Sequence, residues 1–173
     1  PVALTSSTKH KPDLPNPDVS YLWNVHTYIN EYIRFSDTKA GVIIVFSSAL
    51  IGSLYAAKLH VAFVSAAMNA WNTGAWVSAS AFLLLALSVV FSAWSIVPRL
   101  WNDQPRGFIF WQSILAHGDA QSYRCSFQGA SSFELVEHLS GHIFTLSRVC
   151  DSKYRLVTLG MWCVLIGGLL AGI

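Results

Sequence analysis

The sequence predicts an all-α integral membrane protein with three transmembrane helices. Of its 173 residues, 53% are hydrophobic and only 12% are charged, whereas about 25% of the residues in a soluble domain are charged. Three stretches without Asp, Glu, Lys or Arg are each long enough, at about 1.5 Å per helical residue, to cross most of a ~30 Å hydrocarbon core. They cover about residues 40–57, 76–97 and 156–173.

The same composition disfavours several classes of function. A net charge of +2 is too small to indicate a nucleic acid polymer as partner. The three cysteines are an odd set without metal-ligand spacing, and the sequence contains no zinc-protease motif, no nucleophile elbow and no phosphate-binding loop. We therefore expect a protein that is not an enzyme, with no metal site and no cofactor, whose main surroundings are the lipid bilayer.

The N-terminal part divides into an arm and a long helix. Residues 1–19 hold four prolines and are expected to form a flexible arm. Residues 20–98 then hold a cytoplasmic helix and the first two spans. Ser20 is a candidate N-cap, and no proline interrupts the chain from Tyr21 to Ala57, so this helix is expected to run straight into the first span.

A row of polar and small residues follows one face of that helix. Lipid offers polar side chains no partner, so we expect the row to face other protein or water. It is either a helix-packing seam or a face that lines or gates a pore, and Arg34 and Asp37 have the spacing of an ion pair. The row, with the lysine at the membrane boundary, comprises Asn30, Arg34, Asp37, Lys39, Gly41 and Ser48.

The other two spans carry packing signals of their own. Asn and Gly residues near 69–74 indicate a turn before the second span. Ser88, Ser92 and Ser95 form a small polar row in that span, which favours helix packing. The third span offers a small-xxx-small pair for close helix contact, formed by Gly168 and Gly172.

The distribution of Lys and Arg predicts the orientation. Ten of the eleven lie in the N-terminal arm, its helix or the middle segment, and Lys58 alone lies on the other side of the first span. By the positive-inside rule, the N-terminus and residues 99–155 are cytoplasmic, and the C-terminus is outside.

Two helices are expected in the cytoplasmic segment 99–155. The first is short and aromatic, covers Phe108–His117, and stops at Gly118. A Gly/Ser-rich turn follows, and the capping-box spacing of Ser131 and Glu134 then opens a second helix. Its apolar stripe packs either against a copy of itself or against the helix at 21–39, which would carry the bundle out of the membrane. The stripe comprises Val136, Leu139, Ile143, Leu146 and Cys150.

Arginine and aromatic side chains in this segment have the chemistry of a nucleotide pocket. Aromatic rings stack on bases and guanidinium groups bind phosphates, although positive-inside composition with interfacial aromatics predicts the same residue types. Glu134, His138 and His142 also have helical metal-site spacing, for which exposed cytosolic side chains are the ordinary explanation. The candidate ligand-binding residues are Arg99, Trp101, Arg106, Trp111 and Arg124.

Three short motifs occur in order between the apolar stretches. They are RFSDTKAG at 34–41, FIFW at 108–111, and LSR at 146–148 followed by KYR at 153–155. Their order and spacing resemble the transmembrane effector domain of Pycsar, a bacterial anti-phage system that signals with cyclic pyrimidine nucleotides. The likeness covers roughly Val25 to Ile173.

The resemblance implies an effector in the bacterial inner membrane that disrupts the membrane when cyclic UMP or cyclic CMP appears. The sequence contains no separate cyclic-nucleotide-binding β-roll, so either residues 99–155 bind the messenger or a separate sensor protein does. We expect a homo-oligomeric bundle whose spans rearrange on activation. The alternative is a membrane anchor or scaffold that docks a partner enzyme or sensor at its cytoplasmic helices.

Overall fold

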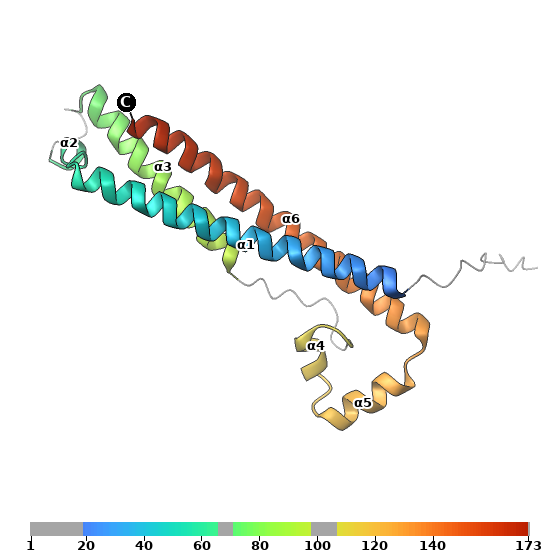
Figure 1. Cartoon of the computed structure of the whole chain (residues 1–173). Helices are drawn as coiled ribbons and strands as arrows, with labels where there is room; N and C mark the ends of the chain where they lie inside the picture. Colours follow the sequence, from blue (N-terminus) through green and yellow to red (C-terminus); the bar gives the residue numbers. More distant parts are fainter. Residues whose placement is uncertain (1–18, 66–70, 98–106, 173) are drawn as a thin grey trace, which may run out of the picture.

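The structure is a computed structural model that describes residues 19–65, 71–97 and 107–172. All regular elements in these residues are helices, and three long ones form an elongated bundle (Figure 1). In order the helices are α1 (Val19–Ala56), α2 (Val61–Val64), α3 (Thr73–Ile96), α4 (Trp111–Leu115), α5 (Ala120–Gly129) and α6 (Ser132–Ala171).

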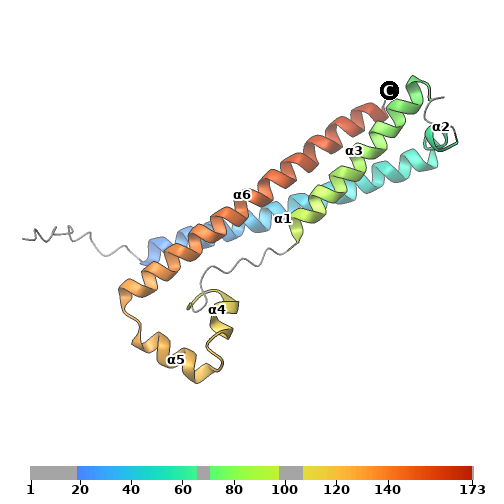
Figure 2. The same cartoon turned by 180° about the vertical axis from the view of Figure 1, so that it is seen from behind.

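The three long helices differ in length. With 38, 24 and 40 residues, α1, α3 and α6 extend over about 57, 36 and 60 Å at 1.5 Å per residue. Helices α1 and α6 run in the same direction and α3 runs against them, as both side views show (Figures 1 and 2). We call residues 19–36 of α1 and 132–152 of α6, which extend beyond the end of α3, the stalk.

The predicted fold class is confirmed. Each of the three long helices is long and apolar enough to cross a membrane. Helix α1 runs without a break from the stalk into the first predicted span. Helix α6 does the same, because the second cytoplasmic helix expected from the sequence and the third span are one helix. The membrane boundaries at residues 40 and 156, and the domain limits drawn from them, stay predictions.

Local signals explain where the long helices begin and end. Helix α1 stops because Lys58 adopts a left-handed conformation (φ 61°), and the N–H of Leu59 donates to the carbonyl of Leu54 over 3.2 Å. Helix α3 begins after Asn72, whose side chain accepts a 2.8 Å hydrogen bond from the N–H of Ala75. At α6 the predicted capping box of Ser131 and Glu134 is confirmed.

The expected turn between the two cytoplasmic helices is wrong. Residues 120–129 form helix α5, because Asp119 caps its N-terminus by accepting a 2.8 Å hydrogen bond from the N–H of Ser122. The aromatic helix before it is shorter than expected and is limited to α4. Gly118 separates the two helices with a positive φ of 85°, a conformation that favours glycine.

The bundle core follows a spacing of three and four residues on each long helix. On α1 the buried positions are Ser36, Ala40, Ile43, Ser47 and Leu54. On α3 they include Leu85, Ser88, Ser92 and Ser95, and on α6 Val157, Gly160, Val164 and Gly167. This spacing is typical of left-handed helix packing.

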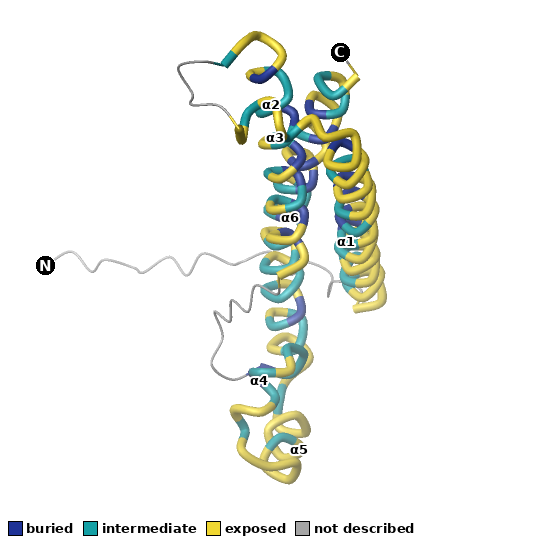
Figure 3. Tube along the Cα trace, turned by 90° about the vertical axis from the view of Figure 1, so that its left-hand side faces the viewer, coloured by how far each residue is buried: buried dark blue, intermediate teal, exposed yellow. Residues whose placement is uncertain are grey.

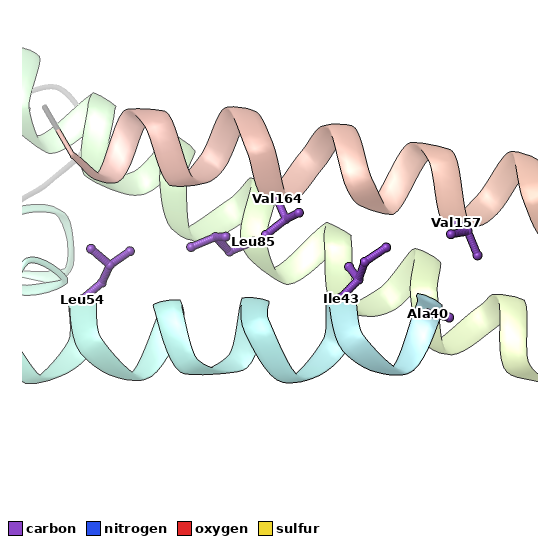
Figure 4. Close-up of a cluster of buried hydrophobic side chains, with 6 residues drawn as sticks. All are labelled: Ala40, Ile43, Leu54, Leu85, Val157 and Val164. Carbon is purple, nitrogen blue, oxygen red and sulfur yellow. The ribbon is translucent and has the colours of Figure 1, made fainter. Parts of the chain in front are cut away.

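Figure 3 shows that the buried residues (dark blue) lie where the three helices meet. Figure 4 shows the apolar cluster at the centre, made by Ala40, Ile43, Leu54, Leu85, Val157 and Val164.

Two glycines other than the predicted pair make the close contact between α6 and α3, and a packing role for Gly168 and Gly172 stays a prediction. A Cβ at Gly160 would lie 2.6 Å from Ser92 Oγ, and one at Gly167 would lie 3.1 Å from Leu84 Cβ. At Gly168 the nearest atom from another helix is 3.7 Å away, an ordinary contact, and Gly172 would meet only backbone oxygens of α6 itself. The close approach of α6 to α3 therefore depends on Gly160 and Gly167.

Candidate functional site

A buried ion pair lies where the stalk joins the three-helix part of the bundle. Lys153 Nζ of α6 donates to Asp37 Oδ1 of α1. The lysine side chain is only 7% exposed, whereas the aspartate side chain is 37% exposed. Lys153 occupies a position of the α6 packing seam, between Cys150 and Val157, where an apolar residue is the ordinary choice. An ionised side chain is tolerated there because it is paired.

Two buried serines, one on α3 and one on α1, lie at the level of the pair. Ser95 Oγ of α3 donates to the backbone carbonyl of Lys153 over 3.4 Å. Ser36, next to Asp37 on α1, is fully buried, and its hydroxyl has no hydrogen-bond partner among the described residues. All three long helices therefore contribute a polar group at this level of the bundle.

A second layer of serines lies deeper in the predicted span. Ser47 of α1 and Ser88 of α3 are fully buried and share a hydrogen bond of 3.0 Å. Ser92 lies between this pair and the ion pair along α3, is fully buried beside Gly160, and its hydroxyl has no partner in the described part of the chain. The predicted serine row of the second span is confirmed as a packing surface. In the half of the core nearer the stalk, these serines thus alternate with the apolar residues Ala40, Ile43 and Val157.

Aromatic side chains lie on both helices next to the residues of the ion pair. Lys39 Nζ lies 4.5 Å from the ring centre of Phe35 and 5.5 Å from that of Tyr154. The ring centres of Tyr32 on α1 and Tyr154 on α6 are 6.2 Å apart, so this aromatic contact links the two helices next to the pair. A cation over aromatic faces contributes about 0.5–1 kcal/mol at an exposed site.

The polar row predicted on α1 is only partly directed inward. Asp37 and Gly41 are partly buried, whereas Asn30, Arg34, Lys39 and Ser48 are exposed. The expected ion pair between Arg34 and Asp37 is wrong. Arg34 Nη1 instead lies 3.9 Å from Glu31 Oε1, and Asp37 pairs with Lys153. The row lies beside the packing face of α1, whose buried positions are displaced by about one residue. Its gating role stays a prediction.

Sequence reasoning missed Lys153, although a signal for it was present. The apolar stripe of the second cytoplasmic helix ends at Cys150, and continuing its alternating spacing of three and four residues leads to Lys153, Val157 and Gly160. A lysine at a core position of a regular seam indicates a buried partner of opposite charge. That partner is Asp37.

The predicted ligand pocket is only partly within the described residues. Arg99, Trp101 and Arg106 lie outside them. Trp111 and Arg124 are both exposed, on α4 and α5. The assignment of these five residues to a ligand stays a prediction.

The structure instead brings aromatic and histidine rings together around Phe108. Its ring centre lies 5.1 Å from that of His138 and 5.7 Å from that of Phe127, and Tyr123 Oη donates to its carbonyl over 3.0 Å. His138 and Glu134 thus contribute to packing and capping, and no group of three metal-ligating side chains lies together among the described residues. This ring cluster attaches the α4–α5 segment to α6.

A cavity of about 320 Å³ lies at the opposite end of the bundle, between α1, α3 and α6. The described residues in its walls carry no charged side chain and are mostly apolar, with Leu54, Phe82 and Leu170 among them. A charged ligand therefore finds no ionic partner there.

Two histidines connect α1 and α6 in the stalk. The rings of His26 and His142 are 5.3 Å apart, with Trp23 beside the first and Phe110 beside the second. Burial lowers the pKa of His26 below its usual 6.5, and burial followed by the charge of His26 lowers the pKa of His142. Both rings are thus held in the neutral form.

We expect this contact to weaken in acid. A histidine with a lowered pKa binds its proton less readily in the folded than in the unfolded chain. Its stabilising contribution is therefore complete above pH 6.5 and is lost as the pH falls through the lowered values. Intrinsic amide exchange slows as the pH falls over this range, so the loss of the contact is measured by protection factors, which compare the observed rate with the intrinsic rate at the same pH. The protection factors of amides in the first turns of α1 should decrease on acidification. The double variant His26→Gln/His142→Gln should not show this decrease, and an equal decrease in the variant would contradict the assignment.

Comparison with known proteins identifies the family. The family model described as "Pycsar effector protein domain" matches residues 21–173, which include all three long helices except the first two residues of α1. The chain belongs to the Pycsar effector family. This Pycsar effector is also 26% identical over 151 residues to the Pycsar effector protein SaPycTM of Staphylococcus aureus, covering 83% of this chain and 89% of that protein. No solved structure matches it.

Family membership confirms the resemblance seen in the sequence. This Pycsar effector is a membrane protein of an anti-phage defence family, and that family is one of membrane effectors rather than of catalysts. The match covers the stalk, the ion pair and the three predicted spans alike. The ion pair therefore lies within the effector domain itself.

Proposed function

We propose that this Pycsar effector disrupts the bacterial inner membrane when a cyclic pyrimidine nucleotide, cyclic UMP or cyclic CMP, signals infection, and that it acts as a gated oligomer. The observation that carries the proposal is the buried Lys153–Asp37 pair at the junction of stalk and spans. In a Pycsar effector, this is where an event in the cytoplasm would have to be passed to the membrane.

The orientation of the proposal has the N-terminus and residues 99–155 in the cytoplasm and the C-terminus outside. The bias of Lys and Arg toward that side supports it. The stalk, α4 and α5 are then exposed to a cytoplasmic signal.

Continuous helices support the coupling between the two sides. Helices α1 and α6 pass from the stalk into the spans without a break, so a displacement of one stalk helix carries its membrane half with it. The ion pair opposes such a displacement because separating it leaves Lys153 buried without a partner. A ligand that favours the displaced arrangement shifts the population by its difference in affinity for the two states.

The signal would reach the protein through the cytoplasmic segment. Either the candidate residues there, including Trp111 and Arg124, bind the nucleotide, or a separate sensor protein docks against α4 and α5. Both routes act on α6, because the ring cluster around Phe108 attaches this segment to it.

An anchor or scaffold is the second candidate. Its support is the exposed apolar surface of the cytoplasmic helices, where Phe133 and Phe144 are 65% and 67% exposed. Such a surface suits a partner protein. An anchor needs no coupling to the membrane, so it should retain partner binding without any effect on permeability.

Dye leakage from liposomes tests the proposal. The purified full chain is reconstituted, and leakage is recorded with cyclic UMP, cyclic CMP, cyclic AMP, cyclic GMP and no nucleotide. We expect leakage with a cyclic pyrimidine nucleotide alone, and cyclic purines serve as matched controls. Equal permeability under all conditions, from protein shown by circular dichroism and protease protection to be folded and inserted, would favour the anchor or a requirement for a separate sensor.

A further inference from the structure

We propose that a second copy of this chain docks on the outer face of α1, along a seven-residue repeat that runs from the stalk through the predicted first span. We call this row the α1 seam. It consists of Tyr21, Tyr28, Phe35, Val42, Ala49 and Ala56. This inference rests on the oligomer of the proposed function and names the contact that forms it, although the contact itself requires no nucleotide.

Every member of the α1 seam is exposed. Tyr21, Tyr28 and Phe35 are 66%, 61% and 56% exposed, and Val42 is 64% exposed. The seam lies on the side of α1 away from α3 and α6, which contact the buried positions such as Ala40 and Ser47 (Figure 3). Helix α1 thus has one heptad face that packs against α3 and α6, and another whose ring contacts among the described residues are with α1 itself: Tyr32 lies beside Tyr28 and Lys39 over Phe35.

A second row completes the pattern of the outer face. Positions three residues after each seam residue are polar in the stalk and apolar or small in the span. They are Asn24, Glu31, Thr38, Val45 and Gly52, all exposed. Together the two rows give the alternating spacing of three and four residues that a partner helix follows in a left-handed supercoil.

The composition of the α1 seam changes at the membrane boundary. In the stalk its members are aromatic, and Tyr21 and Tyr28 lie too far from the predicted boundary at residue 40 for lipid chains to cover them. In the span they become Val and Ala, small residues that allow two helices to approach closely where lipid offers no hydrophobic driving force. A partner that suits both halves must itself be a helix that leaves the membrane at the same level.

A second α1 has these properties. All copies of one chain cross the membrane in the same direction, so two α1 helices meet in parallel and in register, and the same surface serves on both. In that arrangement Phe35 of each copy inserts into the space formed by positions 31, 34, 35 and 38 of the other. Arg34 then lies against the aromatic face of Phe35 of the second copy, a favourable cation–π contact. The Glu31 carboxylates that face one another are neutralised by Arg34, which lies 3.9 Å from Glu31 within each chain.

Cysteine cross-linking in membranes tests this arrangement. Single cysteines are placed at positions 28 to 35 of a full-length chain whose native Cys125, Cys150 and Cys163 are replaced by serine or alanine. We expect disulfide-linked dimers to peak for Tyr28→Cys, Glu31→Cys and Phe35→Cys, and to be several-fold weaker for Ile29→Cys and Ile33→Cys on the inner face. Phe144→Cys is the matched control, because Phe144 is equally outside the predicted spans and is 67% exposed.

The outcomes are distinct. A periodic pattern with a weak Phe144 signal supports the α1 seam. Equal cross-linking at Phe144, or none at seam positions that a maleimide reagent labels, overturns it, and cross-linking to a different protein assigns the face to that partner instead.

As a second measurement, Tyr28→Glu/Phe35→Glu should reduce the protein mass in detergent toward the 19.0 kDa of one chain, whereas Phe144→Glu should not. Leakage is recorded separately, so loss of nucleotide response with intact cross-links would count against the proposed function and not against the seam.

Discussion

Replacing Asp37 by alanine should lower the free energy of unfolding by about 3 kcal/mol and abolish ligand-dependent leakage at unchanged expression. The substitution leaves the Lys153 ammonium, which is 7% exposed, without its partner, and removing one member of a buried pair costs about 3–5 kcal/mol. The lower end applies because the Asp37 side chain is 37% exposed. Unfolding in mixed detergent micelles, followed by circular dichroism, measures the change.

Two matched variants show whether burial is the cause. Arg155→Ala breaks the exposed pair with Asp151, whose N–O distance is 3.0 Å, and should change stability by less than about 1 kcal/mol. The double variant Asp37→Leu/Lys153→Met removes both charges and should recover most of the stability, because apolar replacement of a buried pair is often neutral. We expect it to remain inactive in leakage. Equal losses in Asp37→Ala and Arg155→Ala would show that the Lys153–Asp37 pair is not energetically special.

Replacing Gly160 by alanine should lower the free energy of unfolding by about 1–3 kcal/mol, the usual cost of overfilling a packed core. The added Cβ would lie 2.6 Å from Ser92 Oγ and 3.3 Å from the Ser88 carbonyl, so α6 and α3 must separate. The same measurement in mixed micelles applies.

A second substitution should reverse this loss. Ser92→Ala removes the Oγ atom that the new methyl group meets, and that hydroxyl has no hydrogen-bond partner among the described residues. Gly160→Ala/Ser92→Ala should therefore regain most of the lost stability. Gly41→Ala is the control, because its Cβ meets nothing within 4 Å, and it should be neutral or stabilising by up to about 1 kcal/mol. A destabilised Gly41→Ala, or a double variant without recovery, would contradict the packing account.

Much of the architecture could be predicted because it depends on one-dimensional signals. Apolar length located the three long helices, and the Ser131–Glu134 capping box located the start of α6. Helix α5 was missed because its sequence is polar and rich in small residues, and a single Asp119 cap at its start decides it.

The site was harder to predict because it depends on which faces meet. Helical spacing placed Asp37 on a polar row, but two rows one residue apart are equally regular, and only contact with α6 selects the buried one. Arg34 is nearer to Asp37 in the sequence than Lys153 is, and it pairs with Glu31 because both point away from the bundle. In the third span, all four glycines are compatible with close packing, and the position of α3 selects Gly160 and Gly167.

Helix α6 has the proportions of a lever with nearly equal arms. From Lys153 it extends about 32 Å to the stalk end and about 27 Å to Ala171. If the ion pair is the pivot, a sideways push on the stalk moves the far end by almost the same distance in the opposite direction. A tilt that shifts the stalk tip by the width of one side chain would thus open a gap of similar width at the Ala171 end, where the cavity between the helices is lined mostly by apolar side chains.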